Sequence, residues 1–156
     1  SKDSFMLFAE LIHLFIYGQS LSNGAFGIPV LNTPVSNALM FNTGVRSNGK
    51  NPSSLVPLKE SVTDTSGETI ASGLAHGFVA HSGGMYDRQL IFNAAGVNGI
   101  NIEGLMKGTG NYAQAVSQFN FTAQQAKLSG IEYSQDFMLF MQGGNKYGQW
   151  HPRSQL

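Results

Sequence analysis

The sequence has no cysteine, a single tryptophan and few charged residues. Without cysteine the chain can form no disulfide, no thiolate zinc site and no cysteine nucleophile. Charged residues make up only 12% of the chain, and nine basic residues balance nine acidic ones without any basic cluster. Such a surface offers little of the counterion release that drives binding to DNA or RNA, so we expect no nucleic-acid partner.

The sequence also lacks a long hydrophobic run. The most apolar segment near its start, residues 5–17, is interrupted by Glu10 and His13 and is too short to cross a bilayer. It has no basic leader either, so we expect no membrane segment and no retained signal peptide. No histidine or carboxylate spacing is typical of a metal site, and we predict neither a metal nor a cofactor.

Apolar runs alternate with segments of helical periodicity along the 156 residues, and we find no internal repeat. We therefore predict one domain over residues 1–156. Residues 18–67, which are rich in Gly, Asn, Pro and Ser, are expected to be mostly loop. This pattern predicts an α/β fold with a doubly wound, mainly parallel sheet. Its predicted strands are residues 11–17, 88–95 and 136–142, and its predicted helices are residues 70–79 and 111–129.

Each predicted strand ends in a turn rich in glycine, at residues 18–23, 96–99 and 143–145. Ligands of open α/β sheets bind beyond the carboxyl ends of the strands, so we expect these turns to converge. Ser20 stands in the first turn and offers a hydroxyl nucleophile. Gly99 in the second offers an unhindered backbone N–H, and Asn145 in the third a side-chain amide. Taken singly, each residue is equally typical of an ordinary turn.

Taken together and in this order, Gly-Gln-Ser, a glycine turn and Gly-x-Asn resemble blocks I, II and III of the SGNH hydrolases. The surrounding sequence resembles the carbohydrate-esterase branch that includes sialate O-acetylesterase-like domains and the acetylesterase domains of phage tail proteins. The resemblance spans residues 12–146. The segments that carry it are Tyr17-Gly-Gln-Ser-Leu-Ser-Asn-Gly24, residues 37–46, 55–58, 67–73 and 99–108, and Phe140-Met-Gln-Gly-Gly-Asn145.

The resemblance implies a three-layer, flavodoxin-like fold and a serine esterase. Ser20 would be the nucleophile, and its own N–H, the Gly99 N–H and the Asn145 side chain would hold the oxyanion. The substrate class it implies is an acylated oligo- or polysaccharide, with O-acetyl as the acyl group. The relatives also imply a protein that is extracellular, secreted or associated with a virion.

The end of the chain departs from the family pattern. The family places an Asp, followed three residues later by a His, in a final block; here His151 has Gly148 where the Asp should stand, and the third block lacks its usual acid at Gly144 or Lys146. Three interpretations are open: a truncated fragment whose Asp and His lie elsewhere, an enzyme in which His151 acts without an Asp, or a tail, residues 147–156, that has no role. We favour the first.

Two further hypotheses compete with the esterase. The chain could be a carbohydrate-binding or structural module that kept the sheet and lost the acid–base groups. It could also complete its fold with another chain or a second copy, because a sheet that stops after the third predicted strand leaves an open apolar edge. Activity measurements and sedimentation distinguish these hypotheses.

The remaining titratable residues have plainer interpretations. We expect His13 to be packed within the first strand, His76 to lie on the first helix and His81 to lie in a loop. The isolated acids are expected at the solvated surface, with Glu103 also suited to a helix terminus. Those acids are Asp64, Asp87 and Glu103.

Overall fold

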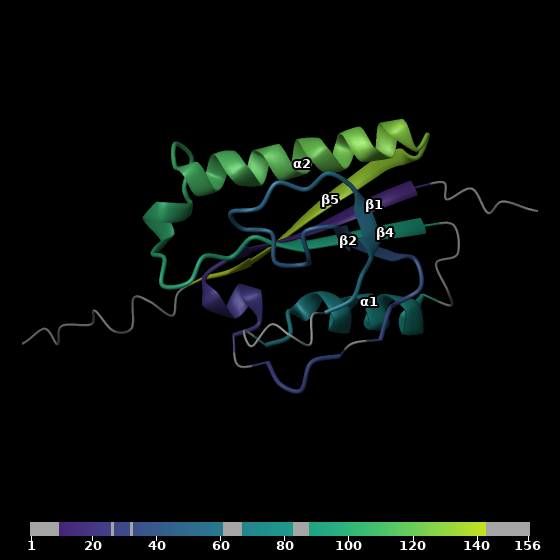
Figure 1. Ribbon diagram of the computed structural model, residues 1–156, viewed down its shortest axis with the longest axis horizontal. Coiled ribbons are helices and arrows are strands. Elements are labelled where there is room, and N and C mark those ends of the chain that lie inside the picture. Colours follow the sequence, from purple (N-terminus) through teal and green to yellow (C-terminus); the bar gives the residue numbers. More distant parts are fainter. Residues whose placement is uncertain (1–9, 26, 32, 61–66, 83–87, 143–156) are drawn as a thin grey trace, which may run out of the picture.

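The computed structural model describes residues 10–25, 27–31, 33–60, 67–82 and 88–142. Within them the chain forms a five-stranded mixed sheet and two α-helices (Figure 1). The strands are β1 (Glu10–Gly18), β2 (Ala38–Phe41), β3 (Leu55–Pro57), β4 (Arg88–Ala94) and β5 (Glu132–Met141). The helices are α1 (Ile70–His81) and α2 (Gly110–Leu128), with short 3₁₀ turns η1 (Ser20–Asn23) and η2 (Ile102–Leu105).

The strand order is β3-β2-β4-β1-β5. β4 and β5 pair in parallel with β1 on either side, and β2 pairs in parallel with β4. Among the described strands only β3 is antiparallel to its neighbour, β2. Parallel strands need long crossovers, which α1 and α2 supply before β4 and β5. The predicted α/β fold with a mainly parallel sheet is therefore confirmed.

The two helices cover opposite faces of the sheet (Figure 1). On one face Leu14 and Ile16 of β1 pack in a cluster with Ala71 and other residues of α1. On the other face Phe15 packs with Ala115 of α2. β1 is thus buried on both faces, which explains why its sequence is a nearly continuous apolar run rather than an alternating one.

Both predicted helices are confirmed, and their ends have identifiable caps. The Thr69 side chain accepts a hydrogen bond from the Ala71 N–H at 3.2 Å, and Thr109 caps α2 in the same way. Helix α1 continues through His81, so placing His81 in a loop was wrong. The His81 ring packs back on its own helix, with Nδ1 2.9 Å from the carbonyl oxygen of Gly77.

Two predicted boundaries differ from the structure. The segment expected to be mostly loop, residues 18–67, contains η1 and the pair β2–β3, whose strands of four and three residues are too short to show a periodic signal. β5 begins at Glu132, four residues before the expected start at Asp136. The prediction started too late because the first four residues of β5, Glu132-Tyr-Ser-Gln135, do not belong to the apolar run on which it was based.

Candidate active site

β1 ends at Gly18, a position that no other residue fits. Gly18 has φ +143°, and a Cβ there would clash with the carbonyl oxygen of Met141 in β5. The Gly18 carbonyl accepts a hydrogen bond from the Val97 N–H at 2.9 Å. The Gln19 N–H donates to the Met141 carbonyl, also at 2.9 Å. These bonds fix the end of β1 between its two neighbours. Ser20 therefore lies at the carboxyl edge of the sheet, two residues after the end of β1.

Ser20 opens the short η1 turn and is half-buried. Among the described residues none hydrogen-bonds its hydroxyl. The neighbouring Ser22 is different: it is fully buried, and its Oγ donates to the Gln19 carbonyl at 2.5 Å. The turn closes at Gly24, which has φ +76°. The Ser22 hydroxyl therefore stabilises the turn, and the Ser20 hydroxyl has no such role among the described contacts.

A two-way clamp joins the first and second glycine turns. Asn23 Nδ2 donates to the Gly96 carbonyl at 2.7 Å, and Gly96 N–H donates to Asn23 Oδ1 at 3.1 Å. A Cβ at Gly96 would clash with Ser22 Oγ. Arg46 Nε also donates a hydrogen bond to the Asn23 carbonyl at 2.9 Å and so ties this turn to the loop after β2. Sequence reasoning quoted Asn23 and Arg46 as parts of motifs but assigned them no such role.

Gly99 lies three residues beyond this clamp, in an exposed turn. It has φ +69°, and a Cβ there would meet no atom within 4 Å. The following residues enter η2, where Asn101 Oδ1 accepts from Gly104 N–H at 3.1 Å. Gln142, the last described residue after β5, donates through Nε2 to the Ile100 carbonyl at 3.1 Å. The ends of β1, β4 and β5 therefore meet at one rim of the sheet.

The other two predicted site residues, Asn145 and His151, lie outside the described residues. The predicted convergence is therefore confirmed for the turn that holds Ser20 and the turn at Gly96. Whether Asn145 reaches the same rim stays a prediction, as does a catalytic role for His151.

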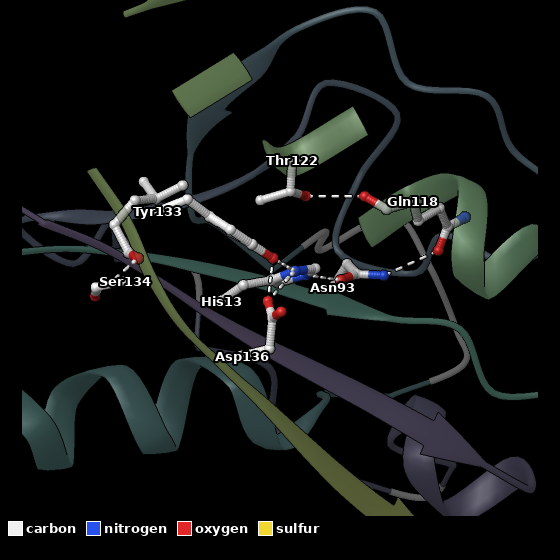
Figure 2. Close-up of polar contacts among 8 residues, drawn as sticks. His13, Asn93, Gln118, Thr122, Tyr133, Ser134 and Asp136 are labelled. Carbon is white, nitrogen blue, oxygen red and sulfur yellow. Dashed lines mark hydrogen bonds and ion pairs between the residues drawn. The ribbon is translucent and has the colours of Figure 1, made fainter. Parts of the chain in front are cut away.

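His13 is not a base for Ser20, because it lies in the middle of β1 and is fully buried, as predicted. Its Nε2 lies 2.5 Å from Asn93 Oδ1, and its Nδ1 lies 3.1 Å from the Tyr133 hydroxyl. That hydroxyl donates to the carboxylate of Asp136, which is itself 3.7 Å from His13 Nδ1 (Figure 2). Burial lowers the pKa of His13, against smaller opposing effects of Asn93 and Asp136.

The network continues from Asn93 to the loop after β2 and to α2. Asn93 Nδ2 donates to Ser47 Oγ at 2.9 Å and to Gln118 Oε1 at 3.0 Å. Gln118 Nε2 in turn donates to the Ser47 carbonyl at 2.8 Å. The Gln118 carbonyl accepts from the Thr122 hydroxyl (Figure 2). Sequence reasoning missed this network. The only trace of it in the sequence is that His13 and Asn93 each interrupt an apolar run.

A second buried polar group supports the start of α1. Glu60 is almost completely buried and accepts a hydrogen bond from Thr69 Oγ1 at 2.5 Å. Burial raises the pKa of Glu60, and the hydrogen bonds from Thr69 oppose that shift. Glu68, which precedes Thr69, accepts a hydrogen bond from the Leu31 N–H through Oε2 at 2.6 Å. These contacts attach the loop that follows η1 to the helix N-terminus.

The remaining titratable residues do not build a second centre in the described part of the chain. His76 is exposed on α1, and Glu103 lies in the first turn of η2. Asp64 and Asp87 lie outside the described residues. Within the described ranges no group of three or more His, Asp or Glu side chains could hold a metal ion. No helix in these ranges has the length and apolar character needed to span a membrane.

We compared this chain with known protein families, curated proteins and solved structures. No family model, no curated protein and no solved structure matches this chain.

Proposed function

We propose that this chain is a serine ester hydrolase that removes O-acyl groups, above all O-acetyl groups, from a carbohydrate. The observation that carries the proposal is the position of Ser20: a half-buried serine just beyond the carboxyl end of β1, a parallel strand that lies between β4 and β5. Its hydroxyl has no hydrogen-bond partner among the described residues. Ligands of open α/β sheets bind at this edge. The family resemblance supplies the reaction class and the carbohydrate.

The proposed reaction has two steps. Ser20 Oγ attacks the ester carbonyl carbon and gives its proton to a base, while the carbonyl oxygen takes the negative charge. Backbone N–H groups at Ser20 and Gly99 and the side chain of Asn145 would hold that oxyanion, and each such donor is typically worth about 3–4 kcal/mol of barrier. The sugar hydroxyl leaves with the proton. Water then hydrolyses the acyl-serine and releases the carboxylic acid.

The test is turnover of p-nitrophenyl acetate by the chain. We expect Ser20→Ala to lower the rate to that of buffer alone. Ser117→Ala, at an exposed serine of α2, should leave the rate unchanged and serves as the matched control. Equal rates for the wild-type chain and Ser20→Ala would refute the enzymatic proposal. Acetate release from an O-acetylated polysaccharide, with the same two variants, tests the carbohydrate assignment.

The general base needs its own experiment, since none of the three described histidines, His13, His76 and His81, contacts Ser20. Two sources are open: His151, or a group that another chain or chain segment brings. His151→Ala separates them. A loss comparable to Ser20→Ala assigns the base to His151, whereas an unchanged rate assigns it elsewhere.

The same observation favours one alternative function, a carbohydrate-binding module without catalysis. In that case an O-acetylated polysaccharide should bind, by calorimetry, equally well to the wild-type chain and to Ser20→Ala. No acetate should be released.

A further inference from the structure

Asn23 lies three residues after Ser20, in the same short turn η1. Hydrogen bonds within the backbone connect the two ends of this turn. The Ser22 N–H donates to the Gln19 carbonyl at 2.9 Å, and the Ala25 N–H donates to the Ser20 carbonyl at 3.3 Å. A contact that fixes Asn23 in space therefore also fixes the backbone of Ser20.

The partner of this turn, Gly96, stands in a segment that the sheet itself holds. The Ala95 N–H donates to the Ile16 carbonyl at 2.8 Å, and the Val97 N–H donates to the Gly18 carbonyl at 2.9 Å. β1 thus binds the residue before Gly96 and the residue after it. The position of Gly96 therefore does not depend on η1.

The turn that carries Gly99 begins directly after Gly96. The Ile100 N–H donates to the Val97 carbonyl at 3.4 Å and closes a turn of four residues. Gly99 is the third of them and has φ +69°. A positive φ at this position is typical of a type II turn, which favours glycine there. The backbone of Gly99 is therefore fixed relative to Gly96.

The Asn23 side chain joins the two turns by a reciprocal pair of hydrogen bonds. Its Nδ2 donates to the Gly96 carbonyl at 2.7 Å, and its Oδ1 accepts from the Gly96 N–H at 3.1 Å. Arg46 holds the other side of Asn23, since its Nε donates to the Asn23 carbonyl and its backbone forms a parallel bridge with Ala94 of β4. These bonds fix both the spacing and the relative direction of the two turns.

We propose that Asn23 is a positioning residue of the esterase, an inference that rests on the proposed function of Ser20. It holds the Ser20 turn at the spacing from the Gly99 turn at which N–H groups of both turns bind one oxyanion. Such donors must lie about 2.7–3.1 Å from the oxyanion, and a misplacement of about 1 Å can lower a rate about 100-fold. The Asn23 amide bonds Gly96 through both of its polar atoms, so it acts through the backbone and not on the substrate.

The reciprocal pair of bonds needs an amide at this position. Asn23→Ala removes both bonds. Asn23→Asp keeps the size and the acceptor for the Gly96 N–H, but it places a carboxylate oxygen against the Gly96 carbonyl. Asn42→Ala is the matched control, because Asn42 makes the same kind of reciprocal pair with Ser53, at 3.0 Å in each direction, in an exposed turn after β2.

The first test is kinetic. We expect Asn23→Ala and Asn23→Asp each to lower kcat for p-nitrophenyl acetate about 100-fold and to leave KM unchanged, because only the transition state carries the oxyanion. Phenylboronic acid adds to a serine hydroxyl as a tetrahedral anion and so mimics that state. Its inhibition constant should rise by the same factor in both variants, whereas Asn42→Ala should change neither quantity.

This inhibition constant separates positioning from a purely structural role. A structural role would lower the folded fraction, which circular dichroism measures, and would leave the inhibition constant of the folded molecules unchanged. If Asn23→Ala does not fold, Asn23→Asp decides the question, since it keeps one of the two bonds.

Amide NMR tests the geometry without catalysis. We expect Asn23→Ala to shift the N–H signals of Ser20 and Gly99, each of which lies three residues from the bonded pair of Asn23 and Gly96. The signal of Ile91, in the middle of β4, should not move.

The outcomes distinguish this inference from the esterase proposal. Turnover and inhibition that survive both Asn23 substitutions, or Ser20 and Gly99 signals that do not move, would overturn the inference alone. A wild-type chain without turnover would instead refute the esterase proposal and, with it, the role of Asn23.

Discussion

Polar side chains in the middle of β1 and just beyond its carboxyl end differ in burial and in hydrogen bonding. His13 in the middle is fully buried, and both of its ring nitrogens have partners. Ser20, seven residues later, is half-buried, and within the described residues its hydroxyl has no partner. Buried polar groups must be paired because an unpaired one costs about 1–3 kcal/mol. A partly exposed group at the edge of the sheet needs no protein partner, because water can hydrogen-bond to it.

β1 thus carries a structural polar residue in its middle and the proposed nucleophile just beyond its end. The polar network around His13 joins β1, β4, β5, α2 and the loop after β2, and so specifies how these elements pack. The face under α1 is packed mainly by apolar side chains, and its buried Glu60 bonds only the start of that helix among the contacts described above. At the rim, glycines let three chain segments approach. Substitutions in each region should therefore have distinct consequences.

The largest effect is expected where the rim begins. Gly18→Ala adds a Cβ that clashes with the Met141 carbonyl, at a φ of +143° that alanine avoids. We expect the free energy of unfolding to fall by roughly 2–5 kcal/mol, measured by urea denaturation. Gly73→Ala is the control, since a Cβ there meets nothing within 4 Å and alanine favours the helix. Equal stability of both variants would contradict the close approach of Gly18 to the Met141 carbonyl.

The next effect is expected in the middle of β1. Asn93→Ala should lower the free energy of unfolding by about 2–4 kcal/mol, because it leaves His13, Ser47 and Gln118 without a shared buried partner. Asn42→Ala is a matched control: Asn42 also makes three side-chain hydrogen bonds, but at an exposed position where water replaces them. A loss as large for Asn42→Ala would show that burial is not the cause.

The pH dependence of stability sharpens the contrast further. Since the folded-state pKa of His13 is below its ordinary value of 6.5, the unfolded chain binds the proton more readily. The contribution of His13 to stability is therefore present above pH 6.5 and is lost as the pH falls, by up to about 1.4 kcal/mol per pH unit. His13→Gln should remove this part of the slope in urea denaturation between pH 7.5 and 5.5. An unchanged slope would contradict a neutral, buried His13.

The smallest effect is expected at Glu60, a buried carboxyl whose Oε2 has no partner among the described residues. Because its folded-state pKa is raised, Glu60 contributes stability below its unfolded value of 4.5, and this is lost as the pH rises. Relative to wild type, Glu60→Gln should gain about 1 kcal/mol or less between pH 4.5 and 7.5. Glu132→Gln, at an exposed position, controls for the change in net charge. The reverse sign would show a well-stabilised carboxylate.

The predictable part of the fold and site follows from local patterns. The apolar run around Phe15 and the periodic segment of α2 predicted their elements within a few residues, because burial on both faces and helical spacing are visible in a short window. Gly18, the last residue of β1, predicted a turn with Ser20 at the sheet edge. β2 and β3 were missed, since strands of four and three residues leave no periodic trace.

The sequence by itself determined that the chain is α/β, where its long elements lie, and that Ser20 follows a buried strand. Only the tertiary structure decided that β1 lies between β4 and β5, that Asn23 clamps Gly96, and that His13 meets partners 80 and 120 residues away. The reason is physical. Periodicity and turn preference depend on neighbours along the chain, whereas strand order and buried polar pairing depend on which distant segments share one core.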